Sequence, residues 1–198
     1  MIGRIAARIR ESAEVKLALL ESEGDRIAQA AEILIDVYRR GGQAIFFGNG
    51  GSAADAVHLA AELVGRYLVD RPALPALALP ANPSAVTAIA NDYGYPAVFA
   101  RQVEAHCRAG DCAIGLSTSG TSANVLAGLE AAARRGGRCI GLSGEDPGPM
   151  RALCDVVIRV PSRRTPRIQE CHILVGHILC ELVEAALFPV PGADASEH

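Results

Sequence analysis

The chain has 198 residues, of which 50% are hydrophobic and 21% are charged, with a formal net charge of -3 at pH 7. This length and balance predict one folded domain with a substantial core, and the negative charge argues against nucleic acid as a partner. No apolar run approaches the roughly 18 residues of a membrane span, and the charged start is unlike a signal peptide, so we expect a cytoplasmic protein.

The first 42 residues carry apolar positions at helical spacing. The pattern predicts two amphipathic helices, with a break at Ser22 to Asp25 and a stop at Gly41 and Gly42. We expect both helices to pack on the core or on a partner subunit.

Beyond these helices, short apolar runs alternate with helical patterns. Strands are predicted at 43–47, 75–80, 112–117, 138–143 and 155–160, and helical patterns near 52–66, 83–107, 122–135, 147–153 and 167–187. Continuous apolar strands that alternate with helices are typical of a parallel sheet covered on both faces. The sequence therefore predicts an α/β fold, a three-layer sandwich in one domain over 1–188, followed by a frayed tail at 189–198.

Cysteine and lysine usage narrows the possible chemistry. The six cysteines are scattered without a C-x-x-C pair, which is typical of reduced, mostly buried thiols. Lys16 is the only lysine and lies in the N-terminal helical region. Schiff-base chemistry and a phosphate-loop lysine are therefore disfavoured.

A glycine-rich turn, "GNGGSA", follows the first predicted strand and opens a helix at residues 48–53. It matches the dinucleotide fingerprint G-x-G-x-x-A, but that fold needs an acidic residue at the end of the second strand to hold the ribose. Here the second strand ends in Leu79-Pro80-Ala81-Asn82, so we expect no nucleotide cofactor. A turn that needs glycine only for its backbone geometry is the remaining alternative.

A second loop at a strand-to-helix junction, "STSGTS" at residues 117–122, supports a phosphate site. Five hydroxyls in six residues exceed what one helix cap needs, and with backbone N–H groups they form a cradle for an anion. Because ligands of parallel sheets bind at the carboxyl ends of the strands, both loops are expected at the same edge. A small molecule with one phosphate fits best.

His58 and Glu62 are four residues apart and share a face of the helix that starts in the glycine turn. The rest of that helix is apolar or small, so we expect it to be largely buried, which would desolvate Glu62 and raise its pKa. Gln169 and His177 of the last helix would complete a zinc-like set. A hydrogen-bonded structural cluster or a subunit contact is the alternative, and His172 is expected to be structural or interfacial.

With these residues in view, the chain resembles a sugar isomerase (SIS) domain of the phosphoheptose isomerase branch over nearly its whole length. The motifs are "FGNGGSAADAVHLAAEL", "TAIANDYGY", "STSGTSANVL" and "RIQECHILVGHILCEL". The resemblance implies a flavodoxin-like, five-stranded parallel sheet and a homotetramer with sites between subunits. It also implies conversion of sedoheptulose 7-phosphate to D-glycero-D-manno-heptose 7-phosphate.

The resemblance also implies roles for particular residues. Glu62 matches the general base and His177 the general acid, and His58, Glu62, Gln169 and His177 match positions that bind zinc in some members. Residues implied in substrate binding are Asn49, Gly50, Gly51, Ser52, Arg66, Asn91, Asp92, Ser117, Thr118, Ser119, Ser122 and Gln169.

One position departs from this branch. Pro166 stands where phosphoheptose isomerases commonly carry an Asp, and the stretch "PSRRTPRIQE" is closer to a tetrameric SIS protein that binds the replication initiator and lacks the catalytic pair. The presence of Glu62 and His177 favours the enzyme. A non-catalytic scaffold or phosphosugar sensor remains the alternative.

Overall fold

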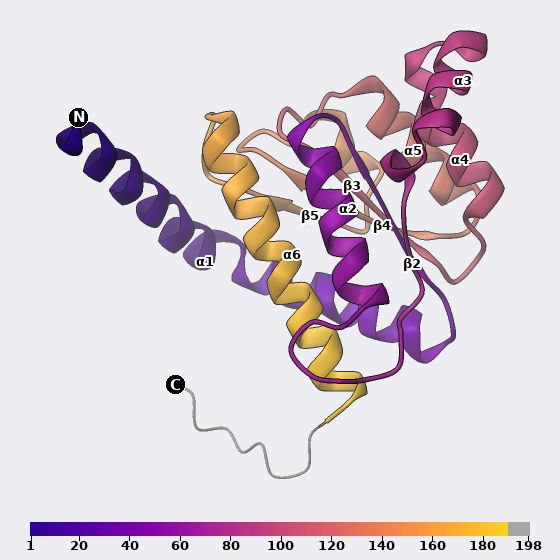
Figure 1. Cartoon of the computed structure of the whole chain (residues 1–198), viewed down its shortest axis with the longest axis horizontal. Helices are drawn as coiled ribbons and strands as arrows, with labels where there is room; N and C mark the ends of the chain where they lie inside the picture. The colour runs from indigo at the N-terminus through magenta and orange to yellow at the C-terminus, as the bar shows by residue number, and fades with distance from the viewer. Residues whose placement is uncertain (190–198) are drawn as a thin grey trace.

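Residues 1–189 are described by a computed structural model, in which a five-stranded sheet lies between two layers of helices (Figure 1). The α/β fold predicted from the sequence is confirmed, and the five strands lie within one or two residues of their predicted ends. The elements are α1 (Ile2–Arg39), β1 (Ala44–Gly48), α2 (Gly51–Val64), β2 (Ala76–Ala78), α3 (Pro83–Tyr93), α4 (Val98–His106), β3 (Cys112–Ser117), α5 (Ala123–Arg134), β4 (Arg138–Ser143), β5 (Val156–Arg159) and α6 (Thr165–Leu187).

All strand pairs in the sheet are parallel, in the order β2-β1-β3-β4-β5. Successive side chains of a strand point to opposite faces, so each strand contributes to two cores. Ala44 and Phe46 pack with α1, α2 and α6, whereas Ile45 and Phe47 pack with α4 and α5. Both faces of the sheet are therefore covered, which explains why its strands are almost wholly apolar.

The prediction of two N-terminal helices is wrong, because α1 continues unbroken from Ile2 to Arg39. The polar residues at the expected break are satisfied without leaving the helix. The hydroxyl of Ser22 donates to the carbonyl of Ala18 at 2.8 Å, and the buried Glu23 carboxylate accepts from Arg159, the last residue of β5, at 2.7 Å. Tertiary pairing thus overrides the local helix-breaking signal.

The prediction of one continuous helical pattern over 83–107 is also wrong. The chain forms α3, a 3-10 turn at Tyr95–Ala97 and then α4. Gly94 ends α3 with φ 85°, a left-handed conformation that suits glycine, and Pro96 lacks the N–H that a continuous helix would use. The helical pattern near 147–153 is a 3-10 turn, Gly148–Ala152.

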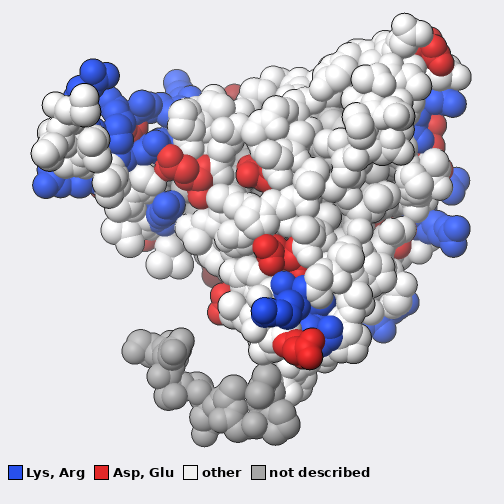
Figure 2. Space-filling view, in the orientation of Figure 1, with Lys and Arg blue, Asp and Glu red and all other residues white. Residues whose placement is uncertain are grey.

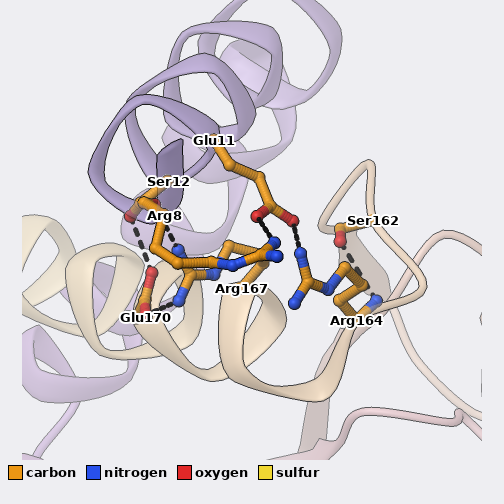
Figure 3. Close-up of polar contacts among 7 residues, drawn as sticks. All are labelled: Arg8, Glu11, Ser12, Ser162, Arg164, Arg167 and Glu170. Atoms are coloured by element: carbon orange, nitrogen blue, oxygen red, sulfur yellow. Dashed lines mark hydrogen bonds and ion pairs between the residues drawn. The ribbon is translucent and has the colours of Figure 1, made fainter. Parts of the chain in front are cut away.

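A polar junction joins α1 to the beginning of α6 (Figure 3). The Ser12 hydroxyl donates to Glu170 at 2.6 Å, and Nη1 of Arg167 donates to the carbonyl of Arg8 at 2.6 Å. Arg164 pairs with Glu11 at the same junction. N-terminal to this junction α1 projects beyond the body of the molecule (Figure 1), and Lys and Arg gather on that projection (Figure 2).

The cysteines behave as the sequence predicts. All six are free thiols, and five of them are buried. Burial raises the pKa of Cys139 and Cys180 to about 12, so neither is poised as a nucleophile. Among residues 1–189 no helix is long and apolar enough to cross a membrane. The prediction for the tail concerns residues 189–198, of which 190–198 lie outside the described part of the chain.

Candidate active site

The two predicted cradle loops leave neighbouring strands at one edge of the sheet. Gly48, the last residue of β1, pairs with Leu116 of β3, and the strand order reverses direction between these two strands. Such a switch point is where open α/β sheets bind ligands. The glycine turn and the hydroxyl loop are therefore adjacent although about 70 residues separate them in the chain.

The glycine turn allows an unusually close approach of the backbone. Gly50 precedes α2 with φ 56°, a conformation that L side chains rarely adopt. A Cβ atom on Gly51 would lie 2.5 Å from Nε2 of Gln169, so the end of the Gln169 side chain lies directly against the turn. Ser52, one residue into the helix, is 3% exposed. The turn thus opens a helix N-terminus beside α6, and the positive end of a helix dipole favours an anion.

The hydroxyl loop is organised by its own side chains. Oγ of Ser117 lies 2.9 Å from Oγ of Ser122 and 3.4 Å from Oγ of Ser119. Ser122 precedes α5, but no side-chain hydroxyl caps that helix. Helix capping therefore does not account for the serines, and the first N–H groups of α5 remain available to an anion. Thr118, half-buried in the same loop, donates no side-chain bond within the described residues.

An amide pair joins the two loops. Nδ2 of Asn49 donates to Oδ1 of Asn124 at 2.8 Å, and Nδ2 of Asn124 donates back to Oδ1 of Asn49 at 2.8 Å. The Tyr95 hydroxyl also donates to Oδ1 of Asn49, at 2.9 Å. Asn124 and Tyr95 lie inside recognised motifs, yet neither was assigned a site role from the sequence. Only their partners in space reveal that they hold Asn49 in place.

His58, Glu62 and His177 come together where α2 packs on α6. Nε2 of His58 lies 3.0 Å from Oε1 of Glu62 and 3.4 Å from Nε2 of His177, and one ligand atom of each residue lies within 4.8 Å of the others. Three groups with lone pairs thus converge on one small volume. Such a volume suits a proton in transfer or a cation.

This convergence depends on close packing between the neighbours of these residues. Gly176 of α6 faces Leu59 of α2, and a Cβ atom at position 176 would lie 2.3 Å from a Leu59 methyl carbon. Without a side chain at Gly176 the two helices approach closely, which brings the adjacent His177 to His58. The rings of these two histidines meet edge to face, with centroids 5.0 Å apart.

The expectation that α2 is largely buried is wrong for the single chain. The side chains of His58 and Glu62 are 48% and 25% exposed, because α2 covers the sheet with one face and presents the other to solvent. Asp55, one turn earlier, is half-buried and its Oδ2 has no hydrogen-bond partner among the described residues. Burial raises the pKa of the Asp55 carboxyl, against the nearby His58.

The remaining predicted site residues lie around these two centres. Gln169 contacts Gly51 at the cradle, and the rise of 1.5 Å per residue places it about 12 Å along α6 from His177. Arg66 follows α2 and is exposed. Asn91 and Asp92, near the end of α3, are exposed and bonded to each other at 2.9 Å. In the described residues, no hydrogen bond joins these three residues to the cradle.

The histidine predicted to be structural is placed as expected. His172 is fully buried, and its Nε2 lies 3.1 Å from the carbonyl oxygen of Ser143. Burial lowers its pKa from 6.5 to about 4, although the bond to that carbonyl opposes the shift. His172 is therefore neutral near pH 7 and takes no part in the exposed histidine pair.

The sequence profile of the SIS domain family matches residues 9–144. A phosphoheptose isomerase of Rhodospirillum rubrum is 57% identical over 161 residues, which cover 81% of this chain and 86% of the relative. The chain belongs to the phosphoheptose isomerase branch of the SIS domain family. A phosphoheptose isomerase of Geobacter sp. strain M21 is 48% identical over 95% of this chain and 98% of the relative.

Solved structures of this branch share the fold. A phosphoheptose isomerase from Neisseria gonorrhoeae is 43% identical and superposes with a TM-score of 0.87, covering 92% of this chain and 98% of the other. One from Francisella tularensis is 32% identical, with a TM-score of 0.88 and coverage of 92% and 97%. The superpositions thus cover most of this chain and nearly all of each solved structure.

Proposed function

We propose that the protein is a phosphoheptose isomerase that converts sedoheptulose 7-phosphate to D-glycero-D-manno-heptose 7-phosphate. The observation that carries this proposal is the meeting of Glu62 and His177, within one cluster, on two helices that begin beside the phosphate cradle. The curated relatives named phosphoheptose isomerase support the same reaction.

A ketose becomes an aldose when one proton moves from C1 to C2 through an enediol and another moves between the two oxygens. The carbon proton needs a base that takes it from C1 and returns it to C2, and the oxygens need an acid. Glu62 is the base in this proposal. His177 is the acid, because an imidazole can both give and take a proton.

The phosphate cradle positions the substrate from its far end. Ser52 and His58 are six residues apart on α2, which the helical rise converts to about 9 Å along the axis. An extended seven-carbon sugar phosphate spans about 10 Å from its phosphorus to C1, with bonds of about 1.5 Å. A phosphate held by Ser52 and the hydroxyl loop would therefore present C1 and C2 near Glu62. Binding energy at the phosphate then serves to orient the reacting carbons.

The donor set fits a zinc ion. Two imidazoles and one carboxylate with an open position are a known zinc combination, and here one ligand atom of each residue lies within 4.8 Å of the others. His58, Glu62 and His177 would hold the ion. Gln169, which the family resemblance adds, lies about 12 Å along α6 from His177 and would have to reach the ion from another subunit. When bound, zinc would polarise the substrate oxygens as a Lewis acid, whereas the proton transfers assigned to Glu62 and His177 need their ligand atoms free of the ion.

The exposed surface around the site supports assembly into the homotetramer that the resemblance implies. Val57, Val64 and Leu68, near the catalytic group, are between 41% and 61% exposed. On the projecting part of α1, Ile2, Ile5 and Ile9 are also exposed. A partner subunit over these side chains would bury apolar surface and would complete the desolvation of Glu62. We also propose a cytoplasmic location, in keeping with the expectation from the sequence.

The test is incubation with sedoheptulose 7-phosphate and detection of the aldose by chromatography. Glu62→Gln and His177→Ala are expected to lower kcat by about 10²-fold or more, because each removes one partner of the proton transfer. Glu130→Gln, an exposed substitution on α5, is the charge-matched control and is expected to behave as wild type. Chelator treatment followed by added zinc measures whether activity depends on the metal.

Two results would overturn the proposal. One is wild-type turnover in Glu62→Gln or His177→Ala. The other is a wild-type protein that binds the sugar phosphate without converting it, which is the behaviour of the alternative, a phosphosugar sensor or scaffold.

A further inference from the structure

A buried ion pair lies next to the catalytic group, by which we mean the cluster of His58, Glu62 and His177. Nε of Arg71 donates to Oε2 of Glu184 at 2.8 Å, and the two side chains are 1% and 3% exposed. Arg71 comes from the loop between α2 and β2, and Glu184 from the last two turns of α6. The pair therefore joins the helix of Glu62 to the helix of His177, next to the end of α2.

The guanidinium closes the C-terminal end of α2. Nη2 of Arg71 donates to the carbonyl of Glu62 at 3.0 Å, and Nη1 donates to the carbonyl of Leu63 at 2.9 Å. The last carbonyls of a helix have no partner within the helix, so this cap satisfies them and sets a cation at the negative end of the helix dipole. The cap thereby holds the backbone of Glu62 at its carbonyl.

The carboxylate holds the loop that follows. Glu184 accepts hydrogen bonds from the backbone N–H groups of Tyr67, Leu68 and Val69 at 3.0, 2.7 and 2.8 Å. This fold of the loop lays the ring of Tyr67 beside the ring of His177, with centroids 5.6 Å apart and planes tilted by 31°. The His177 ring is thus packed between His58 and Tyr67.

Stability alone does not account for such a pair. Replacing a buried ion pair by apolar residues of similar volume is often neutral or stabilising, because removing two charges from water is costly. An apolar pair, however, would leave the carbonyl of Glu62 uncapped and the loop of Tyr67 unheld. The planar fork of arginine satisfies one carboxylate and two helix carbonyls at once, which lysine cannot do.

We infer that Arg71 and Glu184 are positioning residues. Arg71 holds the backbone of Glu62 through its carbonyl, and Glu184 places His177 by holding the loop that carries Tyr67. This role rests on the proposed function of Glu62 and His177. Neither residue touches the substrate in this account. Both act on the geometry of the groups that do.

The experiment compares two double variants. Arg71→Met combined with Glu184→Gln removes both charges at once, so no unpaired charge is left inside the protein. The matched control is Glu23→Gln combined with Arg159→Met, which removes the ion pair that joins α1 to β5. The Glu23 side chain of this pair is also buried, at 1% exposed. Circular dichroism and thermal unfolding check that both variants fold.

We expect the Arg71/Glu184 variant to lose about 10- to 100-fold in kcat, as catalytic groups displaced by about 1 Å do, while KM changes less than about threefold. The phosphate cradle at the opposite end of α2 is untouched, so KM should be spared. Affinity for Zn²⁺ alone, measured by titration calorimetry, should fall by about tenfold or more, as for other residues that orient metal ligands. The control variant should keep both quantities.

Retention of kcat and of Zn²⁺ affinity within twofold of wild type would overturn the inference. So would an equal loss in the control variant, since it would point to general destabilisation. If the wild-type protein does not isomerise the sugar phosphate, the proposed function fails, and the Zn²⁺ affinities of the two variants then decide the positioning role. If wild type binds no Zn²⁺, the separation of kcat from KM decides it.

Discussion

Gly176→Ala tests whether the close contact between α2 and α6 brings His177 to His58 and Glu62, the proposed catalytic group. The new Cβ atom would lie 2.3 Å from a Leu59 methyl carbon, where ordinary contact begins at 3.4 Å, a shortfall of about 1.1 Å. It would also lie 2.9 Å from Cγ of Leu59, so rotating the methyl groups does not clear the space. Leu59 is 1% exposed and cannot move outward, so the helices must separate.

The magnitude follows from two opposing effects. Overpacking a core by a methyl group costs about 1–3 kcal/mol, whereas replacing glycine by alanine inside a helix stabilises by about 1 kcal/mol. Gly24→Ala is the matched control, because a Cβ there meets only Leu20, at 3.7 Å. The free energy of unfolding of Gly176→Ala should therefore lie about 1–3 kcal/mol below that of Gly24→Ala.

Activity should respond more strongly than stability. A displacement of about 1 Å between His177 and the residues of α2 should lower kcat by about 100-fold, and Gly24→Ala should leave kcat unchanged. Urea denaturation followed by circular dichroism gives the stabilities, and initial rates give kcat. The reasoning is refuted if Gly176→Ala stabilises the protein as Gly24→Ala does, with normal kcat, because the helices would then have room for the methyl group.

Two further predictions concern pH and substrate affinity. Because burial lowers the pKa of His172 from 6.5 to about 4, its neutral form stabilises the fold at pH 7, and this stability is lost as the pH falls through that interval. The loss amounts to about 3.5 kcal/mol at 1.4 kcal/mol per pKa unit, and urea denaturation at a series of pH values should show it in wild type but not in His172→Gln. The same slope in both proteins would contradict the assignment. Ser119→Ala should raise KM for the sugar phosphate severalfold with little change in kcat, because the Ser119 hydroxyl lies in the loop of the cradle. Initial-rate kinetics measure this effect, and an unchanged KM would count against a phosphate at this loop.

Much of the fold follows from local patterns in the sequence. Short apolar runs between helical stretches predict a parallel sheet, because only strands covered on both faces are apolar throughout. The same topology places the ends of β1 and β3 at one edge, so the glycine turn and the serine loop could be assigned to one cradle before their contact was known. The motifs of the SIS family lie on these same segments.

Local patterns failed where side chains far apart in the chain decide the outcome. The break expected at Ser22 to Asp25 does not occur, because Glu23 finds its partner Arg159 136 residues away. No local signal marks Arg71 and Glu184 as a pair, since each alone looks like an ordinary surface charge. Asn124 and Tyr95 gain a role only through their bonds to Asn49.

Part of the proposed catalytic group follows from the sequence, and part depends on the tertiary structure. Helical periodicity by itself determines that His58 and Glu62 share a face, since residues four apart on a helix are neighbours. Whether His177 joins them depends on how closely α6 approaches α2, and that distance is set by the missing side chain at Gly176 against Leu59. The sequence by itself determined the layers of the fold and the placing of both proposed cradle loops at one edge of the sheet. Only the tertiary structure decided that Glu62 and His177, the proposed base and acid, meet, because close packing between distant segments is a property of the folded chain.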